Sequence, residues 1–440
     1  MEKTYEVIPS AKRLIKSLRD MGYDFSTAIA DLVDNSIEAG ATQINISVGF
    51  YGNDSYVRIS DNGKGMSEDE LKEAMRYGSE REYHGEDLGK FGLGLKTASM
   101  SQCRCFSVAS RNRSSKNIAI YTWDLSHIEK TNRWEILVLE EQSTIELISA
   151  PITENSGTVI LWEALDRIIG FKDPSGEAAR KKLISMCRDL EIYLGMVFHK
   201  FLAGEVLGKN LSINLNGNPV KSWDPFARDE KETKILSPIK IKLIHDGSEG
   251  KIVLQPYILP AKDKFSSSEE FKRLSGPTGW NQQQGFYIYR AHRLIQSGGW
   301  CGLRIRDEHT KLSRIELNFS PTFDSAFKIN VAKMRVQLPI QIRDVIENAI
   351  KSPVMLARDY YDGDKKSSSV ASTYVSQNIS KPIPIPVKQL ENIAFKPGVP
   401  RMFTLDEIEQ KANELATKTE KKIISGVFLR LRKKLFGEYK

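Results

Sequence analysis

Three short stretches that combine carboxylates, an amide and glycines follow one another early in the chain, and they constrain its fold more than any other feature. They run from Ala30 to Gly40, from Ser60 to Met66 and from Gly89 to Met100. The first lies on an apolar stripe of helical period, and its last glycine fits a helix end. The second directly follows an alternating run typical of a strand. This order predicts a sheet covered by helices.

The first stretch places a carboxylate and an amide on one face of a helix. Asp31 and Asn35 are four residues apart, so their side chains lie one above the other. An asparagine oxygen suits a hard cation such as Mg²⁺, and a carboxylate one turn earlier can orient or deprotonate water. Taken alone, the pair also fits a solvated polar face.

The second and third stretches suggest binding of a base and of phosphates. Asp61 could accept a hydrogen bond from an exocyclic amine, while Gly63 and Gly65 allow the backbone to approach a ring closely. The third stretch has glycines before a helix-forming run, which leaves free N–H groups to cradle phosphate, and Lys96 adds positive charge. Separately, a plain turn and a plain glycine loop explain them equally well.

Together these stretches resemble the N-box, G1 box and G2 box of the GHKL ATPases, which include gyrase B, the ninety-kilodalton heat-shock chaperones, histidine kinases and MutL. A fourth stretch, Gly157–Ile160, is similar to the late Gly-Thr strand of that superfamily. The resemblance implies a Bergerat-type α/β sandwich that binds ATP and Mg²⁺. It also implies hydrolysis of ATP to ADP and phosphate.

The same resemblance assigns expected roles to individual residues. Asn35 would coordinate Mg²⁺, and Asp61 would accept from the adenine amino group with support from Thr158. Asp31 would be the catalytic carboxylate. Hydrolytic members usually carry the longer glutamate there, so slow turnover is expected. The segment between residues 75 and 89 would be the ATP lid. The other residues expected around the nucleotide are Ala39, Gly63, Gly65, Met66, Lys90, Gly92, Leu93, Gly94 and Lys96.

The second half of the chain resembles the transducer domain of the gyrase, MutL and MORC subgroup, with MORC-type ATPases and their bacterial relatives as the nearest likeness. The stretches that carry this resemblance are Gly285–Arg290, Arg293–Ile295, Arg314–Leu317 and Phe327–Pro339. In such proteins a transducer lysine reaches the γ-phosphate, where a cation stabilises the transferred charge. Lys333 is expected to be that catalytic lysine, with Lys328 as the alternative, although Lys333 also fits a surface position.

The chain is therefore expected to be an α+β protein with four segments. These are a GHKL ATP-binding domain over residues 1–170, a ribosomal-protein-like α+β transducer domain over 171–360, a Ser/Pro-rich linker over 361–403 and a basic amphipathic helix over 404–440. A strand over Leu211–Leu215 is expected to belong to the second of these segments.

Charge and composition narrow the setting. Lys and Arg number 64 against 56 Asp and Glu, a net charge of +8, and residues 421–440 hold seven basic residues against Glu438. This tail suits DNA, an acidic partner or a membrane surface, and also a solvated helix end. No apolar run approaches the ~18 residues of a membrane span. Four cysteines without C-x-x-C spacing favour a reducing cytoplasm and no structural zinc.

These features predict an ATP-dependent homodimer that acts as a clamp or remodelling factor, with DNA or other protein subunits as partners and bacterial genome or phage defence as the setting. Two alternatives stay open. One is an ATP-regulated interaction module without turnover, and the other is a chaperone-like ATPase that acts on proteins. A histidine kinase would need a phosphoacceptor histidine before the first stretch, but the first histidine is His84.

Overall fold

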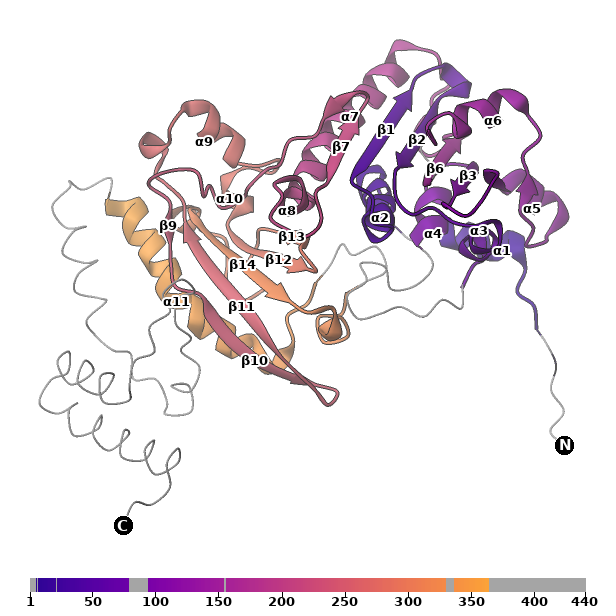
Figure 1. The fold of residues 1–440 in the computed structure, drawn as a ribbon. Helices are drawn as coiled ribbons and strands as arrows, with labels where there is room; N and C mark the ends of the chain where they lie inside the picture. The colour runs from indigo at the N-terminus through magenta and orange to yellow at the C-terminus, as the bar shows by residue number, and fades with distance from the viewer. Residues whose placement is uncertain are drawn as a thin grey trace, which may run out of the picture. The chain divides into compact units, whose positions relative to one another are not determined.

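The computed structural model describes residues 5, 7–20, 22–78, 94–153, 156–329 and 336–363. Lys90, Gly92, Leu93 and Lys333, together with the expected linker and basic tail, lie outside the described residues. The described strands form two sheets, and the long helix α7 (Glu177–Val197) comes before the last two strands of the first sheet along the chain (Figure 1). The mixed α+β class is confirmed.

The first sheet has eight strands among the described residues, in the order β5-β4-β3-β6-β2-β1-β7-β8. All its pairs are antiparallel except β1 with β7, which are parallel. The β7 segment was expected in the second unit, but it extends the first sheet. The strands are β1 (Gln43–Gly49), β2 (Tyr56–Asp61), β3 (Cys105–Arg111), β4 (Ala119–Asp124), β5 (Leu137–Val138), β6 (Gly157–Glu163), β7 (Ser212–Leu215) and β8 (Asn218–Pro219).

Side-chain alternation along these strands separates two apolar layers. On β6, Ile160 and Trp162 join the larger core with α2 (Phe25–Glu38), whereas Val159 and Leu161 face a smaller cluster that includes Ile148 of α6 (Gln142–Ser149). Successive residues of a strand point to opposite faces, so helices cover the sheet on both sides. The remaining helices of this part are α1 (Ala11–Arg19), α3 (Glu68–Met75), α4 (Gly94–Met100) and α5 (Leu125–Thr131).

The second sheet has the order β10-β11-β14-β12-β13, and β9 also pairs with β11. Helix α11 (Ile340–Gly363) lies along one face of it, with Ile342, Ile346, Ile350 and Val354 buried at helical spacing (Figure 1). The strands are β9 (Lys234–Ile235), β10 (Ile239–His245), β11 (Ser248–Ile258), β12 (Gly285–Arg290), β13 (Arg293–Ser297) and β14 (Ser313–Phe319). The short helices are α8 (His199–Leu202), α9 (Ser268–Leu274), α10 (Trp280–Gln283), η1 (Gly52–Asp54), η2 (Lys262–Lys264), η3 (Glu308–Thr310) and η4 (Pro321–Phe323).

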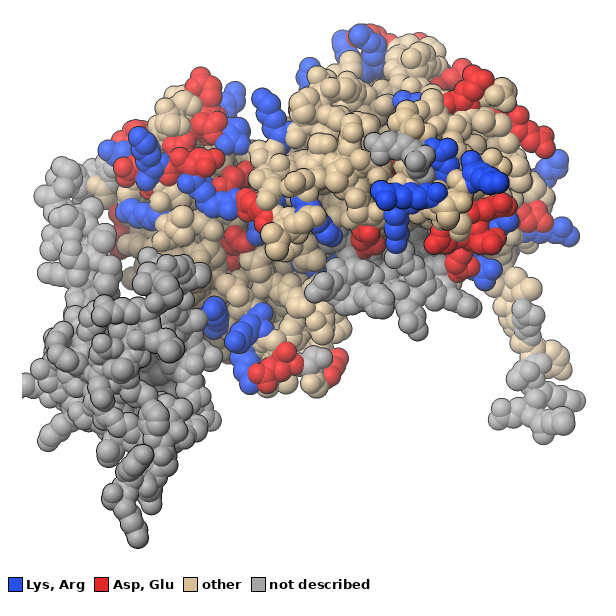
Figure 2. Space-filling view, in the orientation of Figure 1, with Lys and Arg blue, Asp and Glu red and all other residues tan. Residues whose placement is uncertain are grey.

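The surface of the described residues carries both signs of charge. Basic and acidic side chains are interspersed over the face shown in Figure 2, with uncharged surface between them. Within the described ranges, no helix combines the length and apolar character needed to cross a membrane.

Candidate functional site

Helix α2 is the element that brings the predicted polar residues together. A capping box defines its start: the Thr27 backbone N–H donates to the Asp24 carboxylate, and the Asp24 backbone N–H donates to the Thr27 hydroxyl oxygen. Gly40 has a φ of +74°, as expected just after a helix end. Most of the helix is buried, and this includes Asp31, at 2% exposure. Asn35 is only half-buried, so its amide is the more accessible group.

Asp61, at the end of β2, is tied to α2 and to its own turn. Its carboxylate accepts hydrogen bonds from the Ser36 hydroxyl at 2.8 Å and from the Gly63 backbone N–H at 2.9 Å. Burial raises the pKa of Asp61 because it disfavours the charged form, while these two bonds and one from the Thr158 backbone act in the opposite direction. An ionised carboxylate has about four acceptor sites, so Asp61 retains capacity for a ligand amine.

The glycines after Asp61 allow a turn that other residues would obstruct. Gly65 has a φ of +63°, and a Cβ atom added there would lie 1.9 Å from the carbonyl oxygen of Arg111. A Cβ atom at Gly63 would lie 2.8 Å from the Cβ atom of Ala39. The turn therefore packs directly against the end of α2, which places Ala39 beside it. Met66 follows, half-buried, and its N–H donates to the Ser110 hydroxyl at 2.9 Å.

Thr158 lies opposite Asp61 in the register of β2 and β6. Its hydroxyl is 2.9 Å from the hydroxyl of Ser110, which also donates to the Gly157 carbonyl oxygen. The Thr158 side chain thus bonds to Ser110, whereas its contribution to Asp61 comes from the backbone. Support for the Asp61 carboxylate therefore comes from the Thr158 backbone and not from its hydroxyl.

The start of α4 lies next to Asp31, because a Cβ atom added at Gly94 would be 3.6 Å from Asp31 Oδ2. Lys96 on the same helix was expected at the phosphates. In the structure Lys96 is 2% exposed, and its Nζ donates to the Ala74 carbonyl oxygen at 2.9 Å, at the end of α3. Burial lowers the pKa of Lys96 to about 8.

Asp31 is held by groups that the sequence analysis did not assign to the site. The Tyr23 hydroxyl donates to Asp31 Oδ2 at 2.7 Å, and burial together with the Asp31 charge raises the pKa of Tyr23. On the other oxygen, Nη2 of Arg293 lies 3.6 Å from Asp31 Oδ1. In the sequence Arg293 is one charged residue ahead of Leu294 and Ile295, which gives no indication of a partner so far away in the chain.

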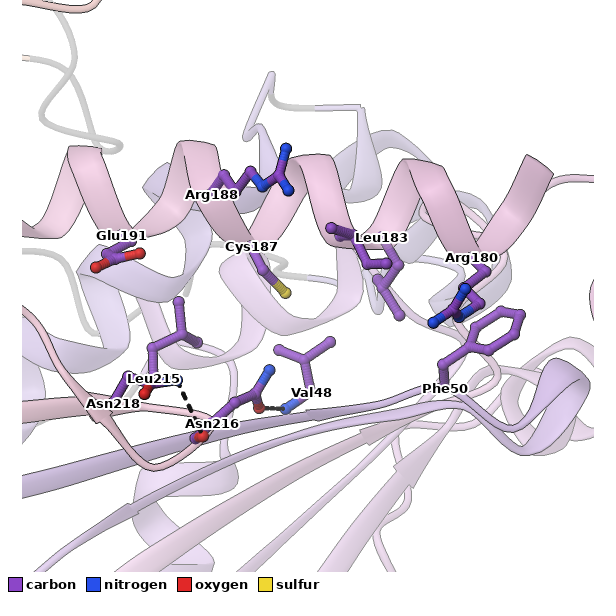
Figure 3. A pocket seen from close by; sticks show the side chains of 11 residues that line it. Val48, Phe50, Arg180, Leu183, Cys187, Arg188, Glu191, Leu215, Asn216 and Asn218 are labelled. Carbon is purple, nitrogen blue, oxygen red and sulfur yellow. Dashed lines mark hydrogen bonds between the residues drawn. The ribbon is translucent and has the colours of Figure 1, made fainter. Parts of the chain in front are cut away.

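A separate cavity of about 370 Å³ lies between α7 and the strands β1 and β7 (Figure 3). Leu183 and Cys187 of α7 face Val48 and Leu215 across it, and the Val48 N–H donates to the side-chain oxygen of Asn216 at 2.7 Å. Val48 lies toward the end of β1 that is remote from Asp61, since Asp61 pairs with Ile44 at the beginning of that strand. This cavity is thus distinct from the polar cluster around α2. Among the described residues, no three His, Cys, Asp or Glu side chains are grouped so as to hold a metal ion.

The first sheet is mostly antiparallel, and helix α2 contacts both Asp61 at the end of β2 and the start of α4 at Gly94. This arrangement agrees with the GHKL nucleotide-binding domain expected from the motifs. A family model described as "Histidine kinase-, DNA gyrase B-, and HSP90-like ATPase" matches residues 23–158. This match supports, over residues 23–158, the GHKL resemblance predicted from the motifs.

Curated relatives point to the same superfamily. The "DNA mismatch repair protein MutL" of Azorhizobium caulinodans is 39% identical over 93 residues, which cover 20% of this chain and 15% of the relative. The protein of that name from Shewanella amazonensis is 26% identical over 237 residues, covering 50% of this chain and 32% of the relative. The chain spans about a third or less of the length of these relatives.

Proposed function

We propose that this chain binds ATP with Mg²⁺ in the cluster around α2 and hydrolyses it slowly. The observation that carries this proposal is the convergence of three motifs on α2. Ser36 bonds to Asp61, Ala39 packs against Gly63, and Asp31 lies beside the start of α4 at Gly94. One helix thereby serves a base-reading carboxylate, a glycine turn and a helix N-terminus of the kind that binds phosphate.

The residues present fit the proposed ligands. The half-buried amide of Asn35 has no hydrogen-bond partner among the described residues, so its oxygen is available as a neutral ligand for Mg²⁺. The metal would neutralise phosphate charge when bound. Asp61 would accept from the adenine amino group, and Asp31, held by Tyr23, would orient or deprotonate water. The aspartate is one methylene shorter than the family's usual glutamate, which supports slow turnover.

The proposed output is an ATP-dependent homodimer that grips or remodels DNA. Two observations support this output: the MutL relatives are named for DNA mismatch repair, and residues 421–440 include seven basic residues. Lys333 is proposed to contact the γ-phosphate. A relationship to MORC-type ATPases and a role in bacterial genome defence are proposed from sequence resemblance alone.

A second candidate is an ATP-regulated interaction module without turnover. The observation in its favour is that both oxygens of Asp31 are already engaged, Oδ2 by Tyr23 and Oδ1 by Arg293. A carboxylate held in this way could serve only as structural support for the site.

Two measurements on four proteins separate these candidates. The proteins are the wild type, Asp31→Asn, Asp61→Asn and, as a matched control, Asp54→Asn at an exposed aspartate of η1. Calorimetry with a non-hydrolysable ATP analogue should show similar affinity in all except Asp61→Asn, which should bind more weakly. Phosphate release should be lost in Asp31→Asn and Asp61→Asn and unchanged in Asp54→Asn. Wild-type binding without phosphate release would favour the second candidate.

Light scattering tests the dimer, with no nucleotide, ADP, ATP and the analogue compared at one protein concentration. The clamp proposal expects a doubling of mass with ATP or the analogue only. DNA binding by the full chain, measured as fluorescence anisotropy of a labelled duplex, should weaken steeply as salt rises. A mass that is the same in all four conditions contradicts the clamp.

A further inference from the structure

Arg293 is a buried cation that the second sheet places against helix α2. It is the first residue of β13, and its side chain is 2% exposed. Its Nε lies 3.0 Å from Oδ1 of Asp34 and its Nη2 lies 3.6 Å from Oδ1 of Asp31, and both carboxylates are on α2. One guanidinium therefore bridges two carboxylates of the helix that organises the nucleotide site.

The surroundings of Arg293 explain how a charge is tolerated there. Burial opposes the guanidinium charge, but Asp34 and Asp31 outweigh it and raise the pKa of Arg293. The guanidinium carbon also lies 5.9 Å from the centre of the Phe198 ring, just after α7. Removing Arg293 or one of its two carboxylate partners would leave an uncompensated buried charge.

The two oxygens of Asp31 are held from different parts of the chain. Tyr23, just before α2, donates to Oδ2, which is the oxygen nearest Gly94. Arg293 attracts Oδ1 of Asp31, and its Nε makes a charge contact of 3.0 Å with Oδ1 of Asp34, which is 0% exposed; this contact is an ion pair and not a hydrogen bond. The planar guanidinium reaches both carboxylates at once, which a lysine ammonium on a flexible stem does with less geometric control.

We infer that Arg293 is a positioning residue for hydrolysis: it fixes the orientation of Asp31 and thereby links turnover to the seating of β13 on α2 and α7. This inference rests on the proposed ATPase function. Arg293 contacts neither Asp61 nor its turn among the described residues, so the adenine end of the site is independent of it. Its loss should reduce kcat while the affinity for nucleotide is largely retained.

The test compares Arg293→Met, Arg293→Lys, Asp34→Asn and the double variant Arg293→Met/Asp34→Asn with the wild type. The matched control is Arg290→Met, which breaks another buried arginine pair, with Asp324 at 2.8 Å, at the position opposite Arg293 in the β12–β13 hairpin. Phosphate release gives kcat, calorimetry with a non-hydrolysable ATP analogue gives Kd, and circular dichroism gives the folded fraction.

The expected result is a fall in kcat of about tenfold in Arg293→Met and in Asp34→Asn, with Kd within about threefold of wild type. Arg293→Lys should lie between, and the double variant should lose no more than either single variant, because both act through one contact. Arg290→Met should keep its kcat per folded molecule. If Arg293→Met does not fold, Arg293→Lys and Asp34→Asn carry the test.

Two outcomes overturn the inference. Wild-type kcat in folded Arg293→Lys and Asp34→Asn would show that Asp31 needs no such positioning, and a parallel loss of kcat and affinity would show a general structural role. Wild type that binds ATP without turnover contradicts the proposed hydrolysis, and this inference with it. Wild-type turnover with unaffected variants contradicts this inference alone.

Discussion

The hydroxyl of Ser36 on α2 donates a hydrogen bond of 2.8 Å to the carboxylate of Asp61 at the end of β2. This bond connects the helix that carries Asp31 to the residue proposed to read the adenine base. The residue proposed to read the base and the proposed catalytic carboxylate are therefore connected through α2.

Replacing the Asp61 carboxylate by an amide should weaken nucleotide binding. Asp61→Asn keeps the side-chain size but removes the charged acceptor, and bonds to charged groups contribute about 1.5–3 kcal/mol, or roughly 10- to 100-fold in affinity. Calorimetry with a non-hydrolysable ATP analogue measures the change. Ser36→Ala is the companion variant, with an expected loss of only a few-fold because the Gly63 N–H still holds the carboxylate. Equal affinity in Asp61→Asn and wild type would contradict the assigned role.

Binding should also weaken on acidification. Because burial raises the pKa of Asp61 in the folded protein, the carboxylate takes up its proton above the ordinary range of about pH 4 and then loses acceptor capacity. Affinities measured from pH 8 down to pH 5 should fall more in wild type than in Asp61→Asn, since titration of the nucleotide itself is common to both. Parallel curves would argue against Asp61 as the titrating group.

Lys96 should make stability depend on alkaline pH. Its folded-state pKa of about 8 lies below the ordinary value of 10.5, so between these values the unfolded chain binds more protons and stability rises with pH. The full effect is about 3 kcal/mol, at about 1.4 kcal/mol for each pH unit. Urea unfolding at pH 7.5 and pH 10 should show this gain in wild type and not in Lys96→Met. An identical pH dependence in both proteins would refute it.

The turn at Gly65 should not accept a side chain. Gly65→Ala combines a φ of +63° with a Cβ atom 1.9 Å from the Arg111 carbonyl oxygen, so backbone must move and we expect a loss of more than about 2 kcal/mol. Gly247→Ala, in the β10–β11 turn, has a φ of +76° with nothing within 4 Å of the added atom. That control should lose about 1 kcal/mol through strain alone. Equal urea midpoints in the two variants would mean that the close approach is absent in solution.

Much of the first sheet and its principal helix could be predicted from local patterns. The apolar stripe of helical period over residues 26–39 predicts a helix, which is α2, and the alternating runs over 43–50 and 55–60 predict strands, which are β1 and β2. The sequence also predicts a helix over residues 337–357, but α11 begins at Ile340, because Pro339 disfavours a helical conformation in the residue before it.

What could not be predicted depends on contacts between distant segments. The ion pair of Arg293 with Asp34 joins residues more than 250 positions apart, and no local sequence pattern around Arg293 predicts such a partner. Lys96 turns toward Ala74 because α3 ends beside it, a packing detail absent from the glycine pattern. For the same reason the parallel pairing of β7 with β1 was missed, since it requires α7 to complete a long crossover first.

That parallel pairing decides which part of the chain can stand by itself. The family match ends at residue 158, yet the outer side of β1 is closed by Ser212–Leu215, and β7 in turn pairs with Asn218–Pro219. A fragment cut near residue 158 or 170 would leave unpaired the backbone N–H and C=O groups of β1 that face β7, which favours association between copies. We therefore expect the smallest fragment that folds with a complete first sheet to extend through Pro219. Under limited proteolysis, a fragment that ends at Pro219 should survive longer than one that ends at residue 158 or 170.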